Sequence, residues 1–281
     1  MKNVWIFLLP LCLLACEGTD EPLPAFLHIT GVDVETTPEQ GSDNARVTNA
    51  FVDANFDELG IVNLPITVPV LERGQVNIRL DPVVRANGSS GSVDVYPFYE
   101  RFETTLDLSE GQIDTIRPVV GYRDDAIFAF VEDFESGNLF TEDRDGDTET
   151  RLEVITNGAF EGASGRVRLT EEHPTVELAT SVNLPFALPT DVRDVWLEVN
   201  FRTDVPLLFG LIGQNNVGDE APAYEWVLNP RTTYSKIYLD MTEAVTITRF
   251  PTYRISFLAS LAGSELNEGS VFLDNVKFIY R

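Results

Sequence analysis

The segment Val195-Trp-Leu-Glu-Val-Asn-Phe-Arg202 alternates between two kinds of residue, and this alternation decides the class of fold. In a β-strand, successive side chains point to opposite faces, so every second residue shares a face. One face of this segment is therefore wholly apolar, with Val195, Leu197, Val199 and Phe201. The other face carries Trp196, Glu198, Asn200 and Arg202. The pattern predicts a strand with one face packed on a hydrophobic core.

Short alternating runs of this kind recur along the chain, and no long helical period interrupts them. Gly, Pro, Asn and Asp separate the runs, which is typical of all-β sandwiches and barrels. In the second half of the chain, the other predicted strands are 126–135, 152–155, 165–169, 175–182, 207–212, 224–228, 236–241, 253–261 and 270–280. This number of short strands in one unit predicts a jelly-roll β-sandwich over residues 124–281.

Three stretches of the second half also carry a resemblance to a known family. They are Glu132-Asp-Phe-Glu135, Tyr234-Ser-Lys-Ile-Tyr-Leu-Asp-Met-Thr242 and Val271-Phe-Leu-Asp-Asn-Val-Lys-Phe278, in that order. Together they resemble the galactose-binding-like jelly rolls, which include many carbohydrate-binding modules. The resemblance spans the whole of 124–281 and implies a recognition module for a glycan or another ligand.

The first half predicts a separate, smaller sandwich. About seven short strands between residues 26 and 122 fit an immunoglobulin-like or transthyretin-like sandwich over 25–123. The turns around Leu59-Gly60, Leu64-Pro65 and Glu72-Arg73-Gly74 resemble those of carboxypeptidase-regulatory and related transthyretin-like domains. That resemblance implies a spacer and carries no functional residues. We place the boundary between the two units near Arg123-Asp124-Asp125.

The N-terminus predicts an exported protein. Lys2 precedes an apolar run, Val4–Leu14, that is too short to span a bilayer but suits a secretory signal peptide. The run ends in Leu13-Leu14-Ala15-Cys16, which resembles the lipobox of bacterial lipoproteins. The resemblance implies that residues 1–16 form the signal and that Cys16 becomes an acylated N-terminus in the lipid bilayer. The alternative is an ordinary secretory signal with a chance cysteine.

Residues 17–24 then predict a tether, since glycine and acidic residues keep it soluble while two prolines stiffen it. The acids that follow Cys16 resemble the export signals of surface lipoproteins in polysaccharide-degrading Gram-negative bacteria. This implies a location at the outer membrane, facing outward.

Composition narrows the functional classes. The 281 residues are 43% hydrophobic, which is enough for packed cores, and the formal net charge is −25. Such a negative field repels phosphates, so we expect no nucleic-acid partner. The alternative interpretation is that the negative charge serves only to keep the protein soluble. The only cysteines are Cys12 and Cys16, so a lipidated mature chain has no thiol for a disulfide or a thiolate metal site.

The galactose-binding-like resemblance implies a structural calcium ion between the opening strand and the last strand. The matching carboxylates are Asp133, Glu135 and Asp274. Calcium takes six to eight hard oxygen ligands, which carboxylates and backbone carbonyls supply. In the alternative interpretation, Asp274-Asn275 marks a bulge and the acids are solvated.

The polar face of 195–202 is the candidate ligand site. Trp196 stands beside Glu198, Asn200 and Arg202, and sugars bind to such sets by stacking on the aromatic ring and pairing their hydroxyls. Arg254, with Ser256, takes the polar side of another predicted strand in the same way. The alternative is an amphipathic outer strand with a tryptophan half-buried under a loop.

The sequence offers few candidate catalytic residues. His28 and His173 are the only histidines, and each lies in a different predicted unit. A glycosidase needs only two carboxylates, but among 45 acidic residues no pair is singled out. The sequence thus predicts a non-enzymatic lipoprotein that binds glycan. The alternatives are a protein-binding accessory subunit of an outer-membrane complex and, more remotely, a glycoside hydrolase.

Overall fold

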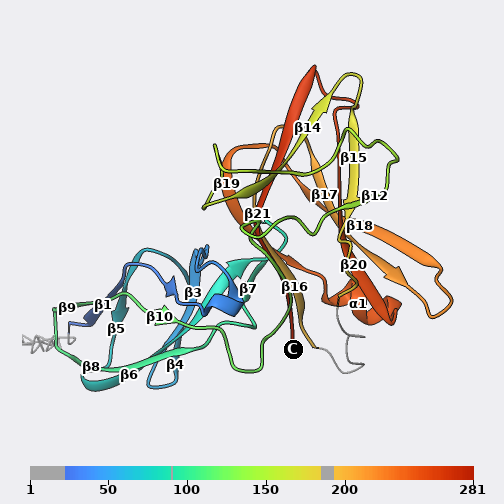
Figure 1. Ribbon diagram of the computed structural model, residues 1–281. Helices are drawn as coiled ribbons and strands as arrows, with labels where there is room; N and C mark the ends of the chain where they lie inside the picture. Colours follow the sequence, from blue (N-terminus) through green and yellow to red (C-terminus); the bar gives the residue numbers. More distant parts are fainter. Residues whose placement is uncertain (1–22, 90, 185–192) are drawn as a thin grey trace, which may run out of the picture.

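The computed structural model describes residues 23–89, 91–184 and 193–281 and shows two β-sandwiches (Figure 1). The predicted signal peptide, Cys16 and residues 17–22 of the tether lie outside the described residues. Within the described ranges, no helix has the length and apolar character needed to cross a membrane.

The first sandwich is built from residues 25–122, with Tyr122 bridged to Tyr99. Its two main sheets enclose a core that includes Leu27, Val52 and Ile78. One sheet has the order β5-β1-β9, and the other has the order β4-β3-β6-β7 with β8 also paired to β6. A short pair, β2-β10, and the 3₁₀ turn η1 complete this unit. The bounds are β1 Ala25–Ile29, β2 Asp33–Val34, η1 Pro38–Gln40, β3 Asn49–Ala54, β4 Asp57–Asn63, β5 Ile66–Val70, β6 Gly74–Arg85, β7 Val93–Val95, β8 Phe102–Leu108, β9 Ile113–Ile116 and β10 Val119–Val120.

The second sandwich is larger and is built from residues 127–280. One sheet has the order β13-β14-β21-β16-β19, with β11 also paired to β21, and the other has the order β12-β15-β20-β17-β18. One short helix, α1, follows β19. The bounds are β11 Ile127–Glu132, β12 Glu142–Asp143, β13 Glu153–Ile155, β14 Ser164–Thr170, β15 Thr175–Ala179, β16 Val195–Thr203, β17 Leu207–Gln214, β18 Glu220–Leu228, β19 Arg231–Asp240, α1 Thr242–Thr248, β20 Thr252–Ser260 and β21 Glu268–Tyr280.

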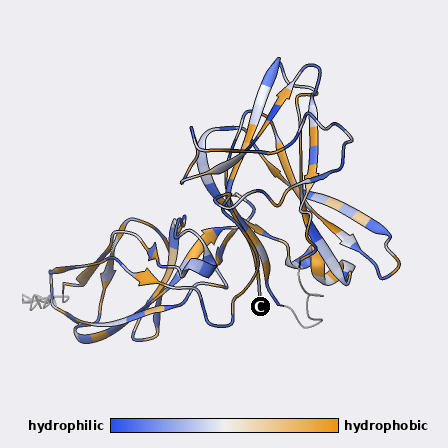
Figure 2. Ribbon diagram, in the orientation of Figure 1, coloured by the Kyte–Doolittle hydropathy of each residue, from blue (hydrophilic) through white to orange (hydrophobic). Residues whose placement is uncertain are grey.

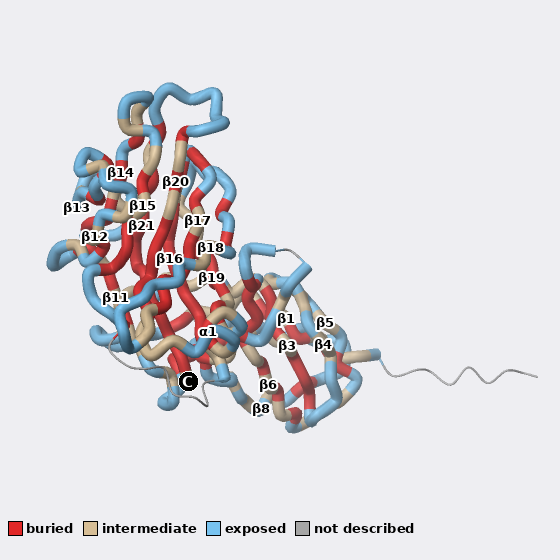
Figure 3. The backbone as a smooth tube through the Cα atoms, turned by 90° about the vertical axis from the view of Figure 1, so that its right-hand side faces the viewer, coloured by how far each residue is buried: buried red, intermediate tan, exposed pale blue. Residues whose placement is uncertain are grey.

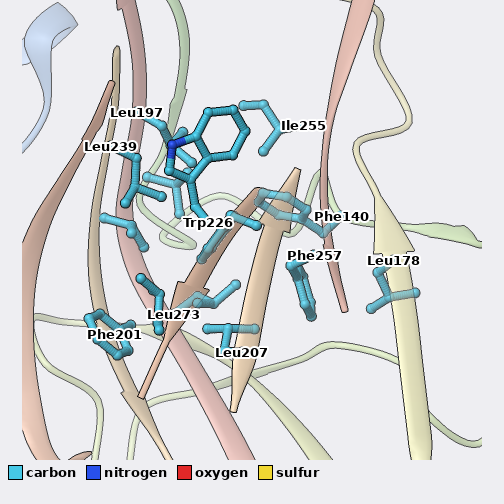
Figure 4. Packing of buried hydrophobic residues seen from close by; sticks show 14 of the residues in the cluster. Phe140, Leu178, Leu197, Phe201, Leu207, Trp226, Leu239, Ile255, Phe257 and Leu273 are labelled. Atoms are coloured by element: carbon cyan, nitrogen blue, oxygen red, sulfur yellow. The ribbon is translucent and has the colours of Figure 1, made fainter. Parts of the chain in front are cut away.

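The apolar face of β16 packs into the core of the second sandwich, as the alternation predicts. Leu197 and Phe201 lie there with Phe257 of β20 and Leu273 of β21 (Figure 4). Full burial of one such side chain contributes about 1.5–3 kcal/mol. Hydrophobic and hydrophilic residues alternate along the strands (Figure 2), and the buried residues follow the strands while most loops are exposed (Figure 3).

The predicted fold class, all-β with two successive sandwiches, is confirmed. Most predicted strands in the second unit match observed ones to within a few residues, for example 207–212 against β17. Helix α1 was not predicted, because seven residues with only Val245 buried leave no helical period to detect.

The two sandwiches share a third hydrophobic core. Tyr96, Tyr99 and Tyr122 of the first unit pack with residues of β16, β19 and β21 of the second, namely Trp196, Tyr238 and Ile279. In Figure 1 the lower ends of β16 and β21 reach the first sandwich. At β16, β19 and β21 this sheet therefore has hydrophobic side chains packed on both faces.

Candidate functional site

The prediction that the polar face of β16 is an open ligand platform is wrong. Trp196 is 4% exposed, Glu198 0% and Asn200 1%. The first sandwich covers them, and the rings of Tyr96 and Trp196 meet edge-to-face with centroids 5.4 Å apart. The face carries an aromatic residue and polar groups because it forms an interface between the two units.

Glu198 is the centre of this interface. Its Oε1 accepts hydrogen bonds from the phenols of Tyr96, at 2.6 Å, and Tyr122, at 2.7 Å. Its Oε2 lies 2.8 Å from Nζ of Lys236. Burial alone would raise the pKa of Glu198, but attraction by Lys236 and Lys277 and these hydrogen bonds hold it below the ordinary value. The carboxylate is thus ionised and neutralised inside the protein.

Lys277 is the second buried cation of the interface. It is 0% exposed, and its Nζ donates a 2.5 Å hydrogen bond to the backbone carbonyl of Ser42 in the first unit. Burial lowers the pKa of Lys277 to about 8, although attraction by Glu198 opposes this shift. Lys236 and Lys277 are the only lysines after the predicted signal peptide, and both are buried at the interface between the units.

The remaining two platform residues lie at the edge of the interface. Asn200 donates from Nδ2 to Oδ1 of Asn44 in the first unit, at 2.7 Å. Arg202 is partly exposed, and its guanidinium lies 3.8 Å from the ring centre of Phe272 and 5.3 Å from that of Tyr234. The structure therefore separates these residues from Arg254, which lies on the other sheet.

Arg254 lies on the outer face of the sheet β12-β15-β20-β17-β18, where it is 8% exposed beneath its ion-pair partners. Figure 1 places this sheet on the side of the second sandwich away from the first unit. Arg254 forms ion pairs with Glu142 of β12 and Glu220 of β18. Arg144 contacts the same two carboxylates at 2.9 and 2.8 Å. A hydrogen bond from Arg144 lowers the pKa of Glu220, so the network is charged at neutral pH.

Tyr224 of β18 adds an aromatic ring to this network. Its hydroxyl donates to Oε1 of Glu177, at 2.8 Å, and lies 2.5 Å from Oγ of Ser256. Burial, with the adjacent Glu177, raises the pKa of Tyr224. Leu208 and Leu258 pair across β17 and β20 and are partly exposed beside it.

We call this surface the open sheet face, defined by Glu142, Arg144, Glu177, Leu208, Glu220, Tyr224, Arg254, Ser256 and Leu258. It combines guanidinium donors, carboxylate acceptors and a phenol on one rigid sheet. Sequence reasoning found only Arg254 and Ser256 of this set. Of the others, Leu258 also lies on β20, and the rest lie on β12, β15, β17 and β18 or in the adjoining loop, so that only the strand order brings them to β20.

The predicted calcium ligands Asp133, Glu135 and Asp274 line one hollow of about 410 Å³, together with Glu161. Asp274 is 1% exposed. Its Oδ2 accepts a 2.7 Å hydrogen bond from the hydroxyl of Ser164. Burial raises the pKa of Asp274 to about 6, and the charge of Glu161 adds to the shift.

The structure brings these carboxylates to one place without closing a coordination cage. Among the described residues, no three carboxylate, imidazole or thiol groups converge as metal ligands do. Glu135 instead accepts from the backbone N–H of Ala163 at 2.7 Å, and Asp133 accepts from that of Glu135 at 3.1 Å. Calcium binding therefore stays a prediction that needs rearrangement of these side chains.

No family model matches the chain, and no curated protein matches it. Solved structures similar to it include carbohydrate-binding modules with β-sandwich folds. The family 11 module from Clostridium thermocellum is 13% identical to this chain, with a TM-score of 0.38. The match covers 53% of this chain and 93% of the module. The family 30 module of a cellulosomal cellulase from the same organism is 16% identical, with coverage of 56% and 93% and a TM-score of 0.36. At these identities and scores the likeness identifies neither a family nor a ligand for this chain.

Proposed function

We propose that this protein is a non-enzymatic glycan-binding protein and that the open sheet face is its binding surface. The observation that carries the proposal is the network in which Arg144 and Arg254 share the carboxylates of Glu142 and Glu220 next to Tyr224. Each sugar hydroxyl both donates and accepts a hydrogen bond, so a glycan needs acceptors and donors side by side.

The network also fixes its own side chains. Each guanidinium of the network contacts two carboxylates, and the Tyr224 hydroxyl is held by Glu177 and Ser256. A surface whose side chains are already ordered loses less conformational entropy when it binds a ligand. The ring of Tyr224 and the partly exposed leucines supply apolar area for the CH face of a sugar.

We further propose that the protein is anchored in the outer membrane by an acylated Cys16 and faces outward. The support is the lipobox-like sequence 13–16 together with the acidic residues that follow it. A further support is that the open sheet face lies on the side of the second sandwich away from the first unit, which follows the predicted tether.

The test is binding of the mature chain to a panel of plant and microbial polysaccharides by affinity gel electrophoresis. Tyr224→Ala is expected to weaken binding about 10-fold or more, since stacking on an aromatic ring contributes roughly 0.5–1.5 kcal/mol beyond its buried area. Glu177→Gln, which keeps side-chain volume, is expected to weaken it less. Phe56→Ala removes an exposed aromatic of the first unit and is the matched control.

Failure of the wild type to bind any polysaccharide contradicts the proposed function. Unchanged binding by a folded Tyr224→Ala variant contradicts the assignment of the surface. Stoichiometric co-purification with an envelope protein through the same face identifies the chain as an accessory subunit instead.

A further inference from the structure

A second surface of the molecule has the opposite charge to the rest of the chain. Two adjoining hollows, of about 60 and 320 Å³, lie where β19 of the second unit meets residues 44–48 and 85–88 of the first. They share the lining residues Arg46, Arg231, Ser235 and Lys236. We call them together the basic groove, whose other lining residues include Asn44, Arg85, Phe160, Asn200 and Tyr234.

The charge of the groove is unusual for this chain. The protein has 45 acidic and 20 basic residues, yet among the described residues no carboxylate lines either hollow. Most arginines of the chain pair with a carboxylate. In the part of the chain that the structure describes, Arg46, Arg85 and Arg231 are exposed and form no salt bridge. Arg46 donates one hydrogen bond from Nη1 to Oγ of Ser235, at 2.5 Å, and its other donors, like those of Arg85 and Arg231, are available to a carboxylate or a sulfate, which the planar fork binds bidentately.

The groove also holds a buried acceptor without a partner. Asn200 is 1% exposed and donates from Nδ2 to Oδ1 of Asn44, but its own Oδ1 has no hydrogen-bond partner among the described residues. A buried polar atom left unsatisfied destabilises the structure, and a hydrogen bond from a ligand hydroxyl would satisfy it. Sulfate and chloride have no proton to donate there, so the site suits a ligand that carries hydroxyls as well as negative charge.

Aromatic rings form one wall of the groove. The rings of Phe160 and Tyr234 lie 5.2 Å apart, and both are partly exposed. The guanidinium of Arg202 lies 5.3 Å from the centre of the Tyr234 ring and helps to hold this ring in place. Such a wall offers a stacking surface to a sugar ring.

We propose that the basic groove binds an acidic sugar unit, with its carboxylate or sulfate on Arg46 and Arg231 and a hydroxyl on Asn200. This rests on the proposed function in that the ligand is a glycan, and it adds the class of glycan. The site is made by both sandwiches, since Arg46 comes from the first and Arg231 from the second. The closed interface around Glu198 holds the two sandwiches, and with them Arg46 and Arg231, in a fixed arrangement.

The experiment measures binding of the mature chain by calorimetry to four oligosaccharides of equal length. These are an oligogalacturonide, its methyl ester, a sulfated galactan fragment and the same fragment after desulfation. The wild type is expected to prefer the charged member of one pair about 10-fold, which corresponds to roughly 1.4 kcal/mol. The pair that shows the preference tells a carboxylate from a sulfate, and equal binding within both pairs overturns the proposal.

Variants separate the groove from the open sheet face. Arg46→Gln with Arg231→Gln is expected to abolish the preference for the charged oligosaccharide while leaving the melting temperature unchanged, because both side chains are exposed. Arg193→Gln, at another exposed arginine, is the matched control and should retain it. Retention by the groove variant overturns the groove proposal and leaves the proposed function intact. If Tyr224→Ala loses glycan binding while the groove variant keeps its preference for the charged oligosaccharide, the groove proposal is likewise overturned and the proposed function stands. Absence of binding to all four ligands and to every neutral polysaccharide contradicts both.

Discussion

The phenol of Tyr96 donates a 2.6 Å hydrogen bond to Glu198, so a side chain of the first sandwich satisfies the buried carboxylate of the second. Tyr122 makes a second such bond, and Lys236 supplies the counter-charge from β19. A buried carboxylate is expensive unless it is both paired and hydrogen-bonded. The second sandwich therefore depends on the first to satisfy the buried polar groups on the interface side of β16.

Glu198→Gln is expected to lower the free energy of unfolding by about 3–5 kcal/mol at neutral pH, because Lys236 then remains buried without a counter-charge. Urea unfolding followed by circular dichroism measures this loss. Glu268→Gln removes an exposed partner of Arg168 and is the control, with an expected loss below about 1 kcal/mol. Equal effects of the two substitutions would contradict the central role of Glu198.

The same variant has a defined pH dependence. The folded pKa of Glu198 lies below its ordinary value of 4.5, so its ionisation stabilises the fold above pH 4.5 and this contribution is lost as the pH falls through the folded pKa. The difference in stability between wild type and Glu198→Gln should therefore narrow in acid. A constant difference down to strongly acidic pH would refute this assignment.

The tyrosines of the interface predict the behaviour in alkali. Burial, and then the charge of Glu198, raises the pKa of Tyr96, Tyr99 and Tyr122 well above the ordinary value of 10.0. Their neutral forms stabilise the fold below pH 10, and this stability is lost as the pH rises toward the folded pKa values. Tyrosinate absorbance and far-ultraviolet circular dichroism should therefore change together. Ionisation of all eight tyrosines before any unfolding is the contrary result.

The sequence predicted the strands better than it predicted their surroundings. The alternation of 195–202 correctly places Leu197 and Phe201 in a core, because period two reports on one strand at a time. It also places Trp196 and Glu198 on the opposite face, but it carries no signal that Tyr96, about a hundred residues earlier, covers that face. An amphipathic strand and a strand between two cores differ only in what packs on them.

The open sheet face was missed for a related reason. Glu142, Glu220 and Arg254 come from three strands that are distant in sequence, and each looks like an ordinary surface charge when taken alone. Only the order β12-β15-β20-β17-β18 brings them together. Asp133 and Asp274 do line one hollow, and the family resemblance predicted this because it supplied the long-range pairing that alternation lacks; calcium binding there stays a prediction.

Cys16→Ser is expected to move the protein from the membrane fraction to the soluble fraction in a bacterial host that processes lipoproteins. Dual acylation gives durable attachment, whereas the acidic surface of this chain offers no attraction to anionic lipids. Metabolic labelling with a fatty acid should mark the wild type and not the variant. Membrane retention of an unlabelled Cys16→Ser chain contradicts the lipid anchor, and protease accessibility on intact cells tests whether the protein faces outward.

Calcium is expected to raise the melting temperature by several degrees relative to excess chelator if Asp133, Glu135 and Asp274 close around the ion. The physical reason is the clustering of these acids with Glu161 at one hollow, where a divalent cation relieves repulsion and binds the folded chain in preference to the unfolded one. Differential scanning calorimetry with calcium, magnesium and chelator measures the shift. Glu135→Gln with Asp133→Asn should abolish it, whereas Asp143→Asn with Asp145→Asn, at the end of β12 and in the bend that follows, should not. Identical melting curves for the wild type in calcium and in chelator would show that hydrogen bonds such as that from Ser164 to Asp274 stabilise this region without a metal.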